Sequence, residues 1–148
     1  MDYGTAMTDE EIGSFLAQRG HGVLSFDGDV PYGLPISFGY DVLHNRCVFQ
    51  LLFAEDSKKS AYLDESAAVN LVADEWRSPD EWRNVVVDGE LSAIPDESPE
   101  AVDAAAVFAE FATAVGLSIF DRPIEELDSG WYELDIRELS GRQAPGME

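Results

Sequence analysis

The feature that most constrains the fold is a series of short apolar segments separated by turn residues. Segments of this kind occupy residues 23–26, 31–40, 47–53, 67–74, 82–94 and 131–136. Apolar and polar residues alternate in several of them, and residues 67–74 form a nearly continuous apolar run, which predicts burial on both faces. Many strands at short spacing with few helices are typical of a small barrel. We therefore expect a mostly β domain, a six-stranded antiparallel barrel with peripheral helices.

Helix signals are few. Thr8 precedes Glu11 by three residues, which is the spacing of a capping box, so a helix is predicted to begin there and to end at Gly20. The other expected segments outside the strands are a short helix at residues 55–63, a loop at 75–81, an alanine-rich helix at 100–115, a helical turn at 123–127 and a frayed tail from 141. Because no linker is long enough to divide the chain, we expect residues 1–148 to form a single domain.

Acidic residues greatly outnumber basic ones. The 148 residues include 30 Asp and Glu but only nine Lys and Arg, so the formal net charge is −21, while the hydrophobic fraction is still 45%. A folded domain tolerates such self-repulsion best in concentrated salt, where the Debye length falls to about 3 Å at 1 M. We expect a halophilic protein of haloarchaeal type with an acidic surface; the alternative is an ordinary acidic protein. Nucleic acids and anionic membranes bind basic surfaces, so neither is an expected partner.

Cysteine and histidine content indicates no disulfide and no metal centre. The single cysteine, Cys47, heads an apolar strand and is expected to be a small core residue. His21 and His44 lie in predicted turns without ligand spacing, and we expect them to be solvated. The acidic N-terminal residues contain no apolar run, so no secretory signal is expected and the predicted location is the cytoplasm.

Two local features suggest a ligand. Lys58 and Lys59 are the only lysines of the chain, and they follow Ser57 at the expected start of a helix, where free backbone N–H groups favour an anion. The alternative is a solvated lysine pair. Pro35 lies in the middle of a predicted strand and removes a donor from the hydrogen-bond ladder, which indicates a sheet edge, a bulge or a ligand against the backbone.

These features occur in an order that resembles the pyridoxamine 5′-phosphate oxidase-like superfamily. The matching stretches are GVLS at residues 22–25, PYGLPISF at 31–38, VFQL at 48–51, DSKK at 56–59 and VVVDG at 85–89. The resemblance covers roughly residues 8 to 95 and implies an FMN-binding split barrel that forms a homodimer with the flavin at the subunit interface. It also implies an FMN-dependent oxidoreductase, in which the flavin supplies the redox chemistry.

The resemblance further implies which residues contact the flavin. A Ser-basic-basic stretch that holds the phosphate falls on residues 57–59, the strand behind the isoalloxazine ring on residues 34–37, and a polar side chain before the Val-x-Gly motif on Asn84. Many members have an arginine early in the flavin-backing strand, where this sequence has Tyr32. The full set of expected cofactor contacts is Tyr32, Leu34, Pro35, Ile36, Ser37, Gln50, Leu51, Ser57, Lys58, Lys59 and Asn84.

The expected substrate motif is absent. True pyridoxamine-phosphate oxidases resemble one another in a C-terminal arginine–x–histidine pair, whereas both histidines here precede residue 45 and Arg137 and Arg142 have no histidine beside them. The substrate and any catalytic residue therefore stay open. Resemblance to nitroimidazole-reductase-like relatives implies one alternative for His21, a place in a substrate pocket. Two alternatives remain: the same barrel binding a deazaflavin such as F420 or haem, and a non-catalytic flavin-binding or sensing module.

Overall fold

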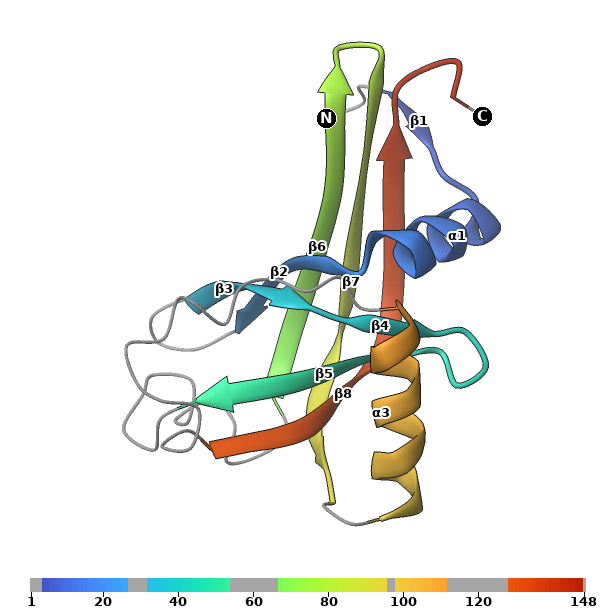
Figure 1. The fold of residues 1–148 in the computed structure, drawn as a ribbon. Helices are drawn as coiled ribbons and strands as arrows, with labels where there is room; N and C mark the ends of the chain where they lie inside the picture. The colour runs from blue at the N-terminus through green and yellow to red at the C-terminus, as the bar shows by residue number, and fades with distance from the viewer. Residues whose placement is uncertain (1–3, 27–31, 54–66, 96–97, 112–127, 148) are drawn as a thin grey trace.

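The strands of the computed structural model form one strongly curled antiparallel sheet (Figure 1). The structure describes residues 4–26, 32–53, 67–95, 98–111 and 128–147. The predicted helical segments at residues 55–63 and 123–127 lie outside these ranges. The elements within them are β1 (Thr5–Ala6), α1 (Asp9–Arg19), β2 (His21–Phe26), β3 (Tyr32–Ser37), β4 (Gly39–Asp41), β5 (Arg46–Phe53), β6 (Ala67–Ser78), β7 (Glu81–Ile94), α3 (Pro99–Phe111) and β8 (Asp128–Gln143).

The order of strands shows how the sheet closes. It runs β3-β2-β6-β7-β8-β5-β4, with β1 paired to β8. The two end strands, β3 and β4, are consecutive in the chain and are separated only by Phe38. The sheet must therefore curl until its two ends meet, which gives a half-open barrel. This confirms the expected antiparallel split barrel with peripheral helices.

The described residues contain eight strands, against six expected. One extra strand arises because the predicted segment 31–40 changes its partner at Phe38: β3 pairs with β2, and β4 pairs with β5. The other is β1, a two-residue strand that pairs with the end of β8. A change of partner has no sequence signal because the apolar pattern continues through it.

The last strand is much longer than residues 131–136, and the predicted frayed tail is wrong. Gln143 and Ala144 have no exposed surface, and β8 pairs with β7 over most of its length. A register shift at Asp88 and Gly89 lets the long strands bend around the barrel. A side chain at Gly89 would collide with the carbonyl oxygen of Asp135, so glycine is required there. The sequence analysis missed the part of β8 beyond Ile136 because its polar, exposed residues interrupt the apolar alternation.

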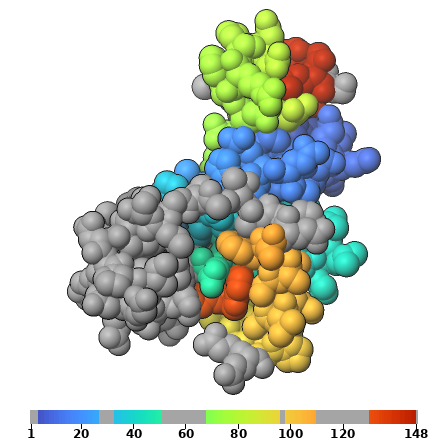
Figure 2. All heavy atoms as spheres, in the orientation of Figure 1, coloured from blue at the N-terminus to red at the C-terminus, as the bar shows by residue number. Residues whose placement is uncertain are grey.

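The predicted loop at 75–81 is also wrong. β6 continues to Ser78 and β7 begins at Glu81, so that a tight hairpin with Trp76 opposite Trp82 projects beyond the barrel (Figure 1). Figure 2 shows this hairpin and the end of β8 standing beyond α1 at one end of the molecule.

Large apolar side chains fill the barrel. Helices α1 and α3 pack against different parts of it. α1 begins with the expected capping box: the amide of Glu11 donates to Thr8 Oγ1 (3.1 Å) and that of Thr8 donates to Glu11 Oε1 (2.9 Å). It ends at Gly20, whose φ of 68° suits glycine. α3 packs on the outer face of the sheet through Ala101 and Ala104. Neither of these described helices has the length and apolar character that crossing a membrane requires. Fully buried core residues are Leu16, Leu24, Phe38, Phe49, Leu71, Val85, Val87 and Leu134.

Candidate functional site

At Phe38 the chain passes from β3, which pairs with β2, to β4, which pairs with β5. This change of partner leaves the described sheet open between β3 and the C-terminal part of β5. β4 pairs with residues 46–48 of β5, whereas β3 turns away and pairs with β2. Within the described residues, β3 and the part of β5 from Phe49 to Phe53 each have one strand neighbour only. Both strands therefore present backbone N–H and C=O groups along the opening, which are strong hydrogen-bonding groups for a planar ligand.

The predicted flavin-backing strand divides its side chains between the two faces of β3. Leu34 packs against the barrel core and Ile36 lies within it, at 6% exposed. Pro35 is exposed on the outer face, opposite Val23 of β2. Pro35 thus lies on a strand at the end of the described sheet, which is one of the three arrangements that its missing N–H indicated. Ser37 shares the outer face with Pro35 but is buried, and it lies opposite His21.

The other predicted contacts are only partly brought together. Gln50 lies on β5 with an exposed side chain, Leu51 follows it opposite Gly130, and Tyr32 opens β3. Asn84 is exposed on β7, which is separated from β3 by β2 and β6, so one chain does not place it beside β3. Three predicted phosphate contacts lie outside the described residues: Ser57, Lys58 and Lys59.

The structure adds an apolar row on the outer face that the sequence analysis missed. Pro35, Val23, Val72 and Val86 are cross-strand partners in turn on β3, β2, β6 and β7. Their chain neighbours Leu24, Leu71 and Val85 point into the core, so this row faces outward. Val23 remains 42% exposed. The continuous apolar run in β6 was the sequence signal for this row. The predicted burial of β6 on both faces is wrong for the single chain, because Ala68 is exposed and Val72 is only half-buried on the outer face.

A buried charge cluster joins β4, β5 and β8 at the hairpin end of β4 and β5. Arg46 donates from Nε to Asp41 Oδ2 (3.0 Å) and from Nη1 to Glu133 Oε2 (2.8 Å), and His44 Nδ1 lies 2.8 Å from Asp41 Oδ2. Asp41 and Arg46 are only 6% and 8% exposed. Burial acts to raise the pKa of Asp41, but hydrogen bonds from His44 and Arg46 outweigh it and hold that pKa below its usual value. His44 is exposed as predicted, but it has a partner.

The structure also shows the surroundings of Cys47 and His21. Cys47 is fully buried, and burial raises the pKa of its thiol far above the usual value, so it is a core residue rather than a nucleophile. The prediction of a solvated His21 is wrong in part: its Nδ1 is buried, without a hydrogen-bond partner among the described residues. No group of three or more described His, Cys, Asp or Glu side chains is placed to hold a metal ion.

The curled antiparallel sheet, open between β3 and β5, defines a split barrel. The family described as pyridoxamine 5′-phosphate oxidase matches residues 8–143. The chain therefore belongs to the pyridoxamine 5′-phosphate oxidase family, as its motifs predicted. No curated protein matches the sequence.

Several solved structures share the fold. The FAD binding protein from Mycobacterium smegmatis has a TM-score of 0.71 at 18% identity, covering 95% of this chain and 98% of that one. A FAD-binding protein from Mesorhizobium loti has a TM-score of 0.68 at 19% identity, with 95% and 97% covered. The FAD and haem binding protein from M. smegmatis has a TM-score of 0.67 at 16% identity, with 94% and 72% covered.

Proposed function

We propose that this protein binds a phosphorylated flavin at the opening between β3 and β5 and uses it in an oxidoreductase reaction. The observation that carries the proposal is the edge of β3, which has one strand neighbour among the described residues and carries the exposed Pro35, in a member of this family. A flavin ring needs a flat apolar support and backbone hydrogen bonds to its polar edge. Pro35 offers the first, and the edges of β3 and of residues 49–53 of β5, each with one strand neighbour among the described residues, offer the second.

FMN is the flavin we propose, with FAD as the second candidate. FMN follows from the paired lysines after Ser57, which suit a terminal phosphate. FAD is favoured by the similar structures: two are FAD-binding proteins, and a third is a protein that binds FAD and haem. When bound, the flavin would supply hydride or electron transfer, and the chain would hold it, orient it and exclude water.

A homodimer completes the proposed site. The outward row of Pro35, Val23, Val72 and Val86 is an apolar strip that a second copy would cover. A second copy also accounts for Asn84, which in one chain lies three strands away from β3. In the dimer, we propose, Asn84 of one chain contacts the flavin held by the other.

A matched pair of charge-adding variants tests the placement. Gln50→Glu adds a negative charge at the opening, and Gln18→Glu adds the same charge to exposed α1. We expect Gln50→Glu to weaken FMN binding by roughly tenfold, because like charges about 4 Å apart repel by about 1–4 kcal/mol between water and a protein surface. Gln18→Glu should bind FMN like the parent. Equal binding by both variants, or a loss confined to Gln18→Glu, would show that the flavin binds elsewhere.

A further inference from the structure

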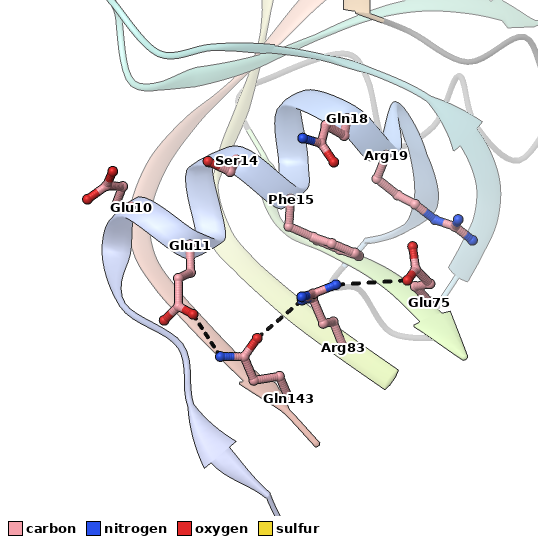
Figure 3. A pocket seen from close by; sticks show the side chains of 9 residues that line it. All are labelled: Glu10, Glu11, Ser14, Phe15, Gln18, Arg19, Glu75, Arg83 and Gln143. Carbon is pink, nitrogen blue, oxygen red and sulfur yellow. Dashed lines mark hydrogen bonds and ion pairs between the residues drawn. The ribbon is translucent and has the colours of Figure 1, made fainter. Parts of the chain in front are cut away.

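A cavity lies between α1 and the ends of β6, β7 and β8 (Figure 3). Its volume is about 460 Å³, within the roughly 300–1,000 Å³ of small-molecule pockets. No residue of β3 or β5 lines it. It is therefore separate from the proposed flavin opening of the same chain, and the inference drawn from it does not depend on flavin binding.

One wall of the cavity is a fixed line of polar side chains. Gln143, which has no exposed surface, donates from Nε2 to Glu11 Oε2 (2.8 Å) and accepts from Arg83 Nε at its Oε1 (3.2 Å). Glu11 is itself held by the backbone amide of Thr8 through the capping box. Both the oxygen and the nitrogen of the Gln143 side-chain amide form hydrogen bonds, so the orientation of the amide is fixed. The amide in turn holds the Arg83 guanidinium through Nε.

Arg83 lines the cavity, and its terminal nitrogen Nη1 lies within ion-pair distance of one carboxylate without forming a hydrogen bond to it. The nearest carboxylate oxygen, Glu75 Oε1, is 3.9 Å from Nη1, which is too long for a hydrogen bond. Glu75 also lies 3.6 Å from Arg77 Nε, so its charge is shared between two guanidinium groups. Arg83 is 30% exposed, and so is partly desolvated while still open to a ligand.

Charge makes this arrangement unusual for the chain. Basic residues number only nine among 148, and two of them, Arg19 and Arg83, line this one cavity. Three carboxylates line it as well: Glu11 accepts hydrogen bonds from Thr8 and Gln143, Glu75 lies 3.6 Å from Arg77, and Glu10 is the third. A guanidinium group fixed through Nε presents its remaining N–H groups in a plane, the geometry that carboxylate and phosphate oxygens match. Phe15 adds an apolar surface to the lining, against which a carbon skeleton can pack.

We propose that this cavity binds a small organic anion, a carboxylate or phosphate ester, whose oxygens contact Arg83 and whose carbon part lies against Phe15. Glu10 at the lining favours a ligand that also carries a donor group. In both anion types, negatively charged oxygens would accept hydrogen bonds from the guanidinium group. A carboxylate probe and a phosphate-ester probe distinguish the two types.

Titration calorimetry of the full chain in molar KCl tests this, with 4-hydroxybutyrate and glycerol 3-phosphate as the two probes, each of which carries an anion and a hydroxyl donor. Arg83→Gln should weaken binding of the preferred probe by about tenfold or more, since a charge-assisted hydrogen bond is lost. Arg137→Gln is the matched control: it removes the same charge from an exposed arginine of β8 that pairs with Glu90. It should bind like the parent.

Two more variants separate binding from folding. Ser14→Trp fills the cavity from exposed Ser14 and replaces no member of the Glu11–Gln143–Arg83 line, and it should abolish binding while the melting temperature stays near that of the parent. Glu75→Gln removes the carboxylate that competes for Arg83, and should tighten binding. No saturable binding of either probe to the parent, or parent-like binding by both Ser14→Trp and Arg83→Gln, would overturn the proposal.

Discussion

Replacing Asp41 with Asn tests the charge cluster that joins the ends of β4, β5 and β8. Asn has the shape of Asp but no charge. The buried Arg46 would keep Glu133 as a partner but lose its charged acceptor at 3.0 Å, and His44 would lose its acceptor at 2.8 Å. A hydrogen bond to a charged group contributes about 1.5–3 kcal/mol, and the Asn oxygen still accepts one neutral bond. We therefore expect the free energy of unfolding to fall by about 2 kcal/mol.

Glu90→Gln is the control for this change. It also removes one negative charge, which by itself relieves repulsion in a chain of net charge −21, but Glu90 is 43% exposed and pairs with exposed Arg137. Exposed ion pairs contribute about 0–1 kcal/mol. Urea unfolding of the two variants and the parent in the same salt measures the difference. If Asp41→Asn costs no more than Glu90→Gln, the cluster does not hold the strands together.

The pH dependence of stability gives a second readout of the same cluster. The pKa of Asp41 is lower in the folded chain than in the unfolded chain. Its contribution is therefore fully present above the ordinary pKa of about 3.9 and is lost as the pH falls below it. The difference in unfolding free energy between the parent and Asp41→Asn should be constant from pH 7 to about pH 5 and shrink in more acidic solution. A difference that grows on acidification would contradict this assignment.

Three further predictions concern salt, assembly and phosphate. The melting temperature should rise steeply from dilute to molar KCl because the net charge of −21 is then screened, and a flat dependence would remove the halophilic interpretation. Val23→Asp should halve the mass seen in sedimentation by placing a charge in the proposed interface, while Val42→Asp, at a 69% exposed turn, should not; a parent that is already monomeric contradicts the dimer. Replacing both Lys58 and Lys59 with Ala should weaken FMN binding by about tenfold or more and riboflavin binding little, as calorimetry at high salt would measure, and parent-like FMN affinity would remove the lysines from the site.

Local signals in the sequence predicted most of the framework. The capping box at Thr8 and Glu11, the apolar alternation of the first strands and the proline at position 35 each act through neighbouring residues, and each is where it was expected. The change of partner at Phe38 was not predictable, because it depends on which distant strand each half of the segment meets. For the same reason, the ordered end of β8 was missed: its burial comes from β1, β7 and α1, far away in sequence.

The candidate site was predictable only in part. Residues 34–37 and Gln50 border the opening, but alternation on β3 turns Leu34 and Ile36 inward, so they support the strand from the core side. Asn84 matched a motif, yet pairing order alone decides that it lies three strands away. The polar line through Gln143 had no sequence signal, because Glu11, Arg83 and Gln143 are brought together only by the fold.

Flavin binding itself is the central claim, and titration of the full chain with FMN, FAD and riboflavin in molar KCl tests it most directly. The absorption spectrum and mass of any cofactor that co-purifies should be recorded first. We predict a yellow protein, or one that binds one flavin per chain, with FMN or FAD at least about tenfold tighter than riboflavin because the phosphate is bound by charge-assisted hydrogen bonds. A colourless protein with no saturable binding of any of the three flavins would contradict the account.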